Sequence, residues 1–262
     1  MSDPEELLRL AHDAAHAAGA LLLDAALRPA EGVRAKSTET DLVSEADLAA
    51  ERAIRELLAE QRPGDTLLGE EGGELRLGDG EPTGVRWVVD PLDGTINFLF
   101  GIPQWCVSVA CEDERGTLAG VVYDAPRGET FAAARDGEPT LDGEPIAASR
   151  SDHLGRAMIA TGFAYDSALR ERQAQVVVGL LPNVRDVRRF GAAAIDLCWT
   201  ACGRVDAYYE RGLNSWDLAA GALICERAGV ALRGLRAVDG LPCGVVAAPP
   251  AIVDELHALV GP

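Results

Sequence analysis

The chain has 262 residues, of which 24 are Lys or Arg and 42 are Asp or Glu, so its formal net charge at pH 7 is -18. This acidity argues against nucleic acid or an anionic membrane as a general partner, because no basic patch is available to release counterions. No apolar run approaches the roughly 20 residues of a spanning helix and no secretory leader is evident, so we expect a soluble, cytoplasmic protein.

The length fits a single domain over residues 1–262, built from an N-terminal α+β lobe over 1–145 and a C-terminal α/β lobe over 146–262. The six cysteines lie in apolar stretches and form no C-x-x-C pair. They are therefore expected to be reduced, buried small hydrophobic residues.

The N-terminal lobe is expected to contain two helices followed by a mostly antiparallel sheet. Apolar residues recur every three or four positions over residues 3–27 and again over 44–59, with a loop or short hairpin over 36–43 between them. A short strand runs into Glu70, and the glycine-rich stretch after it predicts a flexible connection. A further strand is expected at residues 85–89, followed by a corner at "DPLDGT" and a helical or looped segment. Strands at 105–111, 118–123 and 130–133, joined by short turns, are then expected to form an antiparallel meander.

In the C-terminal lobe strands and helices alternate, as in a layered α/β unit. Expected strands lie at about 156–162, 184–190 and 205–210, with two more near the end of the chain, and expected helices at 167–181, 191–203, 214–229 and 250–259.

Two acids end a hydrophobic strand in the stretch "VRWVVDPLDGT". Burying Asp90 and Asp93 costs free energy unless a cation meets them. These two carboxylates and the carbonyl of Leu92 offer the all-oxygen ligation that suits Mg²⁺ or Mn²⁺. Gly94 permits a backbone turn that exposes N–H groups where the next element begins, and Thr95 adds a hydroxyl, a combination typical of a phosphate site.

Further acids stand at other element boundaries. Asp47 lies at a helix start, Glu70 follows a strand and Asp217 opens a late helix. Each alone is explained as compensation of a helix dipole or as a surface charge. Together they indicate a cation site, where divalent ions would invert the local potential and admit an anionic substrate.

Lys36 is the only lysine in the chain. It is either a chance survivor on a surface loop or a point charge placed near anions at a site. The sequence by itself leaves both interpretations open.

Three motifs carry a resemblance to a known family. They are "GEEGG" at residues 69–73, "WVVDPLDGTINFLFGIP" at 87–103 and "NSWDLAAGALICERAG" at 214–229. The haloacid-dehalogenase type of phosphatase also ends a strand on an Asp-Gly-Thr motif, but its two aspartates are two positions apart and here they are three apart. In this order and spacing the motifs resemble the inositol monophosphatase family over nearly the whole chain.

The resemblance implies an α/β (α+β) fold, a layered αβαβα sandwich of the inositol monophosphatase and sugar phosphatase type. It also implies a homodimer, two or three Mg²⁺ ions, inhibition by lithium, and hydrolysis of a small phosphate ester by metal-activated water. The residues implied as metal ligands are Glu70, Asp90, the Leu92 carbonyl, Asp93 and Asp217. Those implied in catalysis are Asp47, Thr95 and Glu70; those implied in binding substrate are Asp93, Gly94, Thr95, Gly191, Ala193 and Glu210; Lys36 and Asp41 would lie beside the site.

The substrate assignment is the most open part of the prediction. "DGTINF" favours inositol 1-phosphate or a similar polyol phosphate, with fructose 1,6-bisphosphate, histidinol phosphate and phosphoadenosine phosphate as sister specificities. Two other classes also stay open: a dimeric interaction protein that retains the metal site, and a metal-buffering acidic protein. Departures from the family pattern occur at Phe100, Ala164, Ala192 and Val230, and none of them removes an implied ligand.

Overall fold

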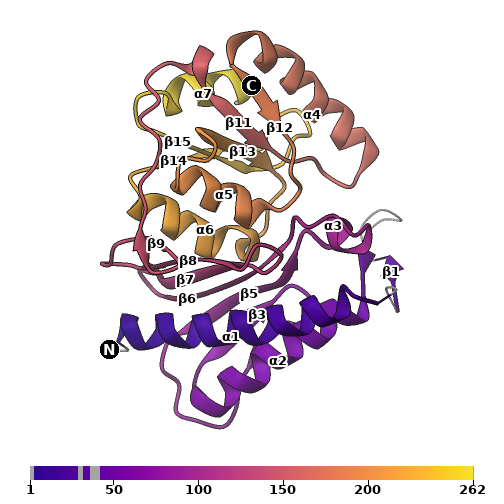
Figure 1. Cartoon of the computed structure of the whole chain (residues 1–262), viewed down its shortest axis with the longest axis vertical. Helices are drawn as coiled ribbons and strands as arrows, with labels where there is room; N and C mark the ends of the chain where they lie inside the picture. The colour runs from indigo at the N-terminus through magenta and orange to yellow at the C-terminus, as the bar shows by residue number, and fades with distance from the viewer. Residues whose placement is uncertain (1–2, 29–31, 36–41, 262) are drawn as a thin grey trace.

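In a computed structural model, which describes residues 3–28, 32–35 and 42–261, helices and sheets alternate in five layers (Figure 1). Helices α1 and α2 cover the outer face of an eight-stranded sheet, α5 and α6 lie between the two sheets, and α4 and α7 cover a five-stranded sheet. The predicted αβαβα architecture is confirmed. The helices are α1 Pro4–Ala25, α2 Glu45–Gln61, α3 Thr95–Leu99, α4 Ser167–Leu180, α5 Ala193–Ala201, α6 Ser215–Arg227 and α7 Val253–Val260.

The larger sheet has the strand order β10-β9-β8-β7-β6-β5-β3-β4 and is antiparallel except where β3 runs parallel to β5. The predicted antiparallel meander is therefore confirmed for β6 to β8, and β5 pairs antiparallel with β6 beside it. The strands are β3 Thr66–Gly69, β4 Gly73–Arg76, β5 Arg86–Asp93, β6 Cys106–Asp113, β7 Gly116–Asp124, β8 Glu129–Ala134, β9 Thr140–Leu141 and β10 Glu144–Pro145.

Strand β4 corrects the expected flexible connection after Glu70. It pairs antiparallel with β3, with Gly69 opposite Gly73, so a tight hairpin replaces the loose segment. Its residues have little intrinsic strand preference, and pairing with a neighbouring strand overrides composition here. The parallel register of β3 and β5 sets Gly69 opposite Val89, which brings Glu70 next to the end of β5.

The smaller sheet has the order β12-β11-β13-β15-β14. Strand β11 is parallel to both its neighbours, whereas β15 is antiparallel to both of its own. The predicted alternation of strands and helices is confirmed. The strands are β11 Met158–Thr161, β12 Asp186–Arg188, β13 Ala207–Arg211, β14 Ala231–Leu235 and β15 Gly244–Ala248.

Helix α1 shows why this chain packs tightly against the sheet. Asp3 caps it by accepting from the Glu5 N–H at 3.1 Å, and Pro4 occupies the first turn. Its buried residues recur every three or four positions and half of them are alanine, so the helix axis can approach the strands closely. Leu7 and Leu22, both fully buried, each contribute about 1.5–3 kcal/mol by leaving water.

A short hairpin lies before α2. Strand β1, Arg34–Ala35, pairs antiparallel with β2, Leu42–Val43. The predictions for Lys36 and Asp41 lie outside the described residues.

Four of the six cysteines are buried, as expected, and Cys202 is half-buried. The expectation is wrong for Cys243, which is exposed just before β15. Among the described residues, no helix combines the length and the apolar character needed to cross a membrane.

Candidate active site

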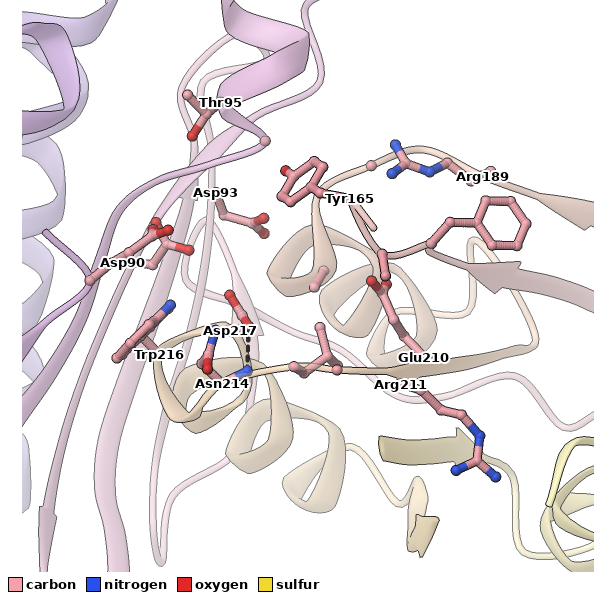
Figure 2. A pocket seen from close by; sticks show the side chains of 18 of the residues that line it. Asp90, Asp93, Thr95, Tyr165, Arg189, Glu210, Arg211, Asn214, Trp216 and Asp217 are labelled. Carbon is pink, nitrogen blue, oxygen red and sulfur yellow. Dashed lines mark hydrogen bonds between the residues drawn. The ribbon is translucent and has the colours of Figure 1, made fainter. Parts of the chain in front are cut away.

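A cavity of about 440 Å³ opens between the end of the larger sheet and the layer of α5 and α6 (Figure 2). It is lined by residues from β5, the β3–β4 turn, the starts of α3, α5 and α6, and the end of β13. Sequence segments more than 100 residues apart therefore meet on one surface. The predicted site residues on its wall are Glu70, Asp90, Leu92, Asp93, Gly94, Thr95, Gly191, Ala193, Glu210 and Asp217.

The two acids of the "DPLDGT" motif lie within β5, where we had expected a corner after residue 89. Asp90 pairs with Ser108 and Asp93 with Cys106, and the register shifts between the two pairs. Such an irregularity re-aims side chains at a sheet end. The Asp90 carboxylate also accepts the Leu92 N–H at 3.0 Å, which fixes the turn of the chain between the acids.

Asp93 is held by the beginning of α5. Its Oδ2 accepts the Ala194 N–H at 2.7 Å, so the helix N-terminus faces a carboxylate. Burial nevertheless outweighs this stabilisation and raises the pKa of Asp93 to about 6. The contact ties the "DPLDGT" motif to the C-terminal half of the chain.

Carboxyl groups crowd one wall of the cavity, where the buried Asp90 and Asp93 and the half-buried Asp217 face a common space (Figure 2). Burial raises the pKa of Asp90 far above its usual range, and the charges of Glu70 and Asp93 raise it further. Burial and the charge of Asp93 act in the same direction on Asp217. The four acids therefore repel one another when all are ionised.

The donor set fits a divalent cation. Within the described residues, no three His, Cys, Asp or Glu side chains converge closely enough to enclose an ion as they stand. Even so, the carboxylates of Glu70, Asp90, Asp93 and Asp217 and the Leu92 carbonyl line one cavity. A divalent ion would relieve this repulsion, and donors that are all oxygen suit Mg²⁺ or Mn²⁺ and not zinc.

Asp217 is positioned by the start of α6. It occupies the third helical position and accepts the Asn214 N–H at 2.6 Å, while the Asn214 side chain accepts from the helix backbone in return. This capping box fixes the direction in which the carboxylate points. Capping and lining the cavity are therefore combined in one side chain.

A second group of hydrogen bonds joins α2 to α3. The Thr95 hydroxyl lies 3.1 Å from Asp47 Oδ1 and 3.0 Å from the Leu92 carbonyl, two acceptors for its single proton. Asp47 Oδ2 accepts the Ser44 N–H at 2.9 Å. Gly94, with φ +93°, makes the turn possible, because an added Cβ would press on the backbone of Gln104. The structure thus brings the predicted pair of Asp47 and Thr95 together.

Glu210 lies across the cavity from the β5 acids, at the end of β13 (Figure 2). The Tyr208 hydroxyl donates to its Oε2 at 2.7 Å. Burial raises the pKa of Glu210 to about 7, and the positive charge of Arg189 opposes this rise. Glu210 is the predicted substrate-hydroxyl ligand, and the structure places it on the cavity wall.

Arg189 and Tyr165 are among the cavity residues that sequence reasoning missed. Arg189 follows β12, and Tyr165 stands in the loop before α4; both side chains reach the cavity (Figure 2). The signal for Arg189 was an arginine two positions before Gly191, a predicted substrate residue. The sequence assigns Arg189 to the expected strand over 184–190, but in the structure this strand ends at Arg188.

Another missed residue is Asp196 in α5. Its side chain is 1% exposed, and neither carboxyl oxygen has a hydrogen-bond partner within the described structure. Burial, followed by the charges of Glu210 and Asp93, raises its pKa well above the usual range. Asp196 is therefore held neutral in the folded chain, which is unfavourable wherever the unfolded chain would ionise it.

We expect Asp196→Asn to stabilise the metal-free protein at pH 8, because the neutral amide does not lose stability as pH rises. A raised folded-state pKa means that the contribution of the acid to stability is complete below its unfolded pKa of about 3.9 and is lost as pH rises through the folded pKa. The gain from Asn should therefore disappear near pH 4. Urea unfolding in EDTA at both pH values measures it, with the exposed Asp152→Asn as the control. A gain of equal size at both pH values would contradict the assignment.

Known proteins resemble this chain along most of its length. The inositol monophosphatase family matches the chain over residues 3–260. The Mycobacterium tuberculosis protein named inositol-1-monophosphatase SuhB is 45% identical over 232 residues, covering 86% of this chain and 80% of the relative. A Pasteurella multocida protein named Nus factor SuhB is 38% identical over 230 residues, covering 87% of this chain and 85% of the relative.

Solved structures extend the similarity to three dimensions. The crystal structure of the extragenic suppressor protein suhB from Bartonella henselae superposes with a TM-score of 0.89 at 31% sequence identity. The superposition covers 97% of this chain and 98% of that one. The shared architecture therefore includes both sheets and the helical layer between them.

Proposed function

Because the chain belongs to the inositol monophosphatase family, we propose that it is a Mg²⁺-dependent phosphomonoesterase acting on inositol 1-phosphate or a similar polyol phosphate. One observation carries the proposal. Four acids from the β3–β4 turn, β5 and α6 line one cavity, next to the hydrogen-bonded pair of Asp47 and Thr95. Phosphate-monoester hydrolysis is among the slowest uncatalysed reactions, so a catalyst for it must stabilise a large developing charge.

The ions would be held by the predicted ligands. Glu70, Asp90, Asp93 and Asp217 would supply carboxylate oxygens, and Leu92 would supply its carbonyl. When bound, two or three Mg²⁺ ions, or Mn²⁺ in their place, would supply the positive charge that lowers the pKa of a water and stabilises a leaving alkoxide. Asp93 would keep its hydrogen bond from the Ala194 N–H and so join the ions to α5.

Asp47 and Thr95 would orient the attacking water. If the Thr95 hydroxyl donates its proton to Asp47, its oxygen lone pairs face outward and accept from the water. The Ser44 N–H donates to the other carboxylate oxygen of Asp47 and fixes its orientation. Asp47 and Thr95 therefore do not have to reorganise when the water binds. We assign Glu70, on the wall of the same cavity, to receive the water proton.

The phosphate and the alcohol would lie on opposite sides of the cavity. We assign the phosphate to the backbone N–H groups of Gly94 and Thr95. We assign the alcohol to Glu210 and to the backbone of Gly191 and Ala193, on the opposite wall. In an in-line displacement the attacking water and the leaving oxygen stand on opposite faces of phosphorus. The alcohol must therefore lie on the side of the phosphate that faces away from the attacking water.

Other properties follow from the family resemblance alone and stay predictions. They are a homodimeric assembly, inhibition by lithium, and a supporting role for Lys36 and Asp41 beside the site. A cytoplasmic location, expected from the sequence composition, also stays a prediction.

Phosphate release from a panel of esters tests the proposal. We expect release with Mg²⁺ and none with EDTA, with inositol 1-phosphate turned over faster than fructose 1,6-bisphosphate, histidinol phosphate or phosphoadenosine phosphate. A different leading substrate would retain the phosphatase assignment and move the protein to a sister specificity. Release that persists in EDTA would contradict the metal dependence.

A second candidate function is an interaction role, favoured by the relative named Nus factor SuhB. Such a role does not need turnover. Folded protein that releases no phosphate from any ester of the panel would favour it over the enzymatic assignment.

A further inference from the structure

Arg189 is the cation that faces the cavity among the described residues (Figure 2). Arg211 also reaches the wall, but its guanidinium turns away and donates to the carbonyls of Arg236 and Pro242 at 2.9 and 2.8 Å. The Arg189 guanidinium forms no hydrogen bond or ion pair with any described residue. An arginine has five N–H donors, so an unpaired one that points into a cavity is a candidate ligand-binding group.

Two glycines make room for Arg189 and for Glu210 on the same wall. A Cβ at Gly191 would overlap the Arg189 guanidinium, and a Cβ at Gly162 would overlap the Glu210 carboxylate. Each charged group therefore rests against bare backbone. A larger residue at Gly191 would displace the Arg189 guanidinium, and one at Gly162 would displace the Glu210 carboxylate. The two glycines therefore allow both charged groups to lie on this wall.

The loop that carries Arg189 is anchored by the "DGTINF" motif. The Asn97 side-chain amide donates to the Phe190 carbonyl at 2.8 Å and to the Gln104 carbonyl at 2.7 Å. Asn97 is buried, so these bonds are shielded from competing water. The position of Arg189 is therefore set by the same motif that carries the metal ligands.

Arg189 and Glu210 interact through space without forming an ion pair. Glu210 already accepts from Tyr208 at one oxygen, which leaves the other for a ligand. The Arg189 guanidinium is a donor and the Glu210 carboxylate is an acceptor on the same wall. They suit a ligand group that accepts a hydrogen bond from Arg189 and donates one to Glu210. A hydroxyl does both, at about 2.7–3.0 Å from each partner, whereas an ionised phosphate only accepts.

We propose that Arg189 binds the hydroxyl groups of the leaving alcohol together with Glu210, and so selects polyol phosphates over esters that lack hydroxyls next to the phosphate. The inference rests on the proposed phosphatase function and names the residue that gives it substrate selectivity. The surroundings of Arg189 favour a neutral polyol over a second phosphate, because the Glu210 carboxylate lies on the same wall and, when ionised, would repel a second phosphate.

Steady-state kinetics of Arg189→Gln on two esters test the proposal. For inositol 1-phosphate we expect kcat/KM to fall about 10- to 100-fold, the range for losing a hydrogen bond to a charged group. For p-nitrophenyl phosphate, which has no hydroxyl, the change should stay below about threefold. Arg189 forms no bond within the described protein, so the variant is expected to fold, which thermal unfolding verifies.

Arg188→Gln is the matched control. Arg188 is the adjacent arginine, but it pairs with Asp186 and does not line the cavity. It should leave both esters unaffected. An equal loss on both esters in Arg189→Gln would overturn the proposal, since Arg189 would then act on the phosphate. A loss largest with fructose 1,6-bisphosphate would overturn it in favour of a second phosphate.

Calorimetric binding of inositol, with Mg²⁺ and inorganic phosphate present, separates this inference from the proposed function. Binding by the parent and its loss in Arg189→Gln would support the role of Arg189 even if no ester is hydrolysed. Equal binding by both proteins, or binding by neither, would overturn the role whatever the turnover.

Discussion

Replacing Asp217 by Asn is expected to lower kcat/KM for inositol 1-phosphate by about 10³-fold or more while the chain stays folded. The carboxylate is one of four that would hold the ions, and loss of several kcal/mol of charge stabilisation corresponds to this factor. Asparagine keeps an oxygen that can accept the Asn214 N–H, so the start of α6 remains capped. Phosphate release at saturating Mg²⁺ measures the loss.

The same substitution should stabilise the metal-free protein at pH 8. The pKa of Asp217 is raised by burial and by Asp93, so the contribution of this acid is complete below pH about 3.9 and is lost as pH rises through the folded pKa. Asparagine at position 217 does not ionise, so this decline in stability with rising pH is absent in the variant. Higher stability combined with lost turnover would distinguish a functional acid from a structural one.

Asp254→Asn is the matched control for Asp217→Asn. Asp254 also stands in the first turn of a helix, α7, but its side chain is 79% exposed and pairs with Arg233. It should change neither turnover nor metal-free stability. Turnover retained by Asp217→Asn would contradict its assignment as a ligand.

The parts of the site that sequence predicted share a local signal. Asp90, Asp93, Gly94 and Thr95 are close in the chain, so their spacing already restricts their geometry. The helix start at Asp217 could also be predicted from the sequence, because a capping residue followed by an acid three positions later marks a helix N-terminus. These features need little knowledge of the tertiary structure.

The parts that sequence did not predict depend on the packing of distant segments. Strand β4 forms only because β3 offers it an edge, and its composition gives no strand signal. Arg189 lies in a loop that Asn97, more than 90 residues earlier, anchors through the Phe190 carbonyl. Asp196 looked like an ordinary helix residue, and its buried, unpartnered state follows from the packing of α5 between two sheets.

Magnesium is expected to raise the unfolding temperature, and to raise it more at pH 8 than at pH 5. Burial and mutual repulsion raise the pKa of Asp90 and Asp217 well above normal and that of Asp93 to about 6. The contribution of these three acids to the stability of the metal-free protein is therefore fully present below pH about 3.9. It declines as pH rises through their pKa values in the folded chain. Mg²⁺ binds the ionised carboxylates, so its effect grows over the same range.

At 100 times its Kd, an ion that binds only the folded chain adds about 2.7 kcal/mol, or roughly 5–10 °C for a chain of this size. Thermal unfolding with Mg²⁺ at both pH values, against K⁺ at equal ionic strength, measures this shift. In Asp217→Asn the shift should shrink, because one ligand and one source of repulsion are both gone. A rise equal at the two pH values, or equal with K⁺, would mean that the ion does not act on these carboxylates.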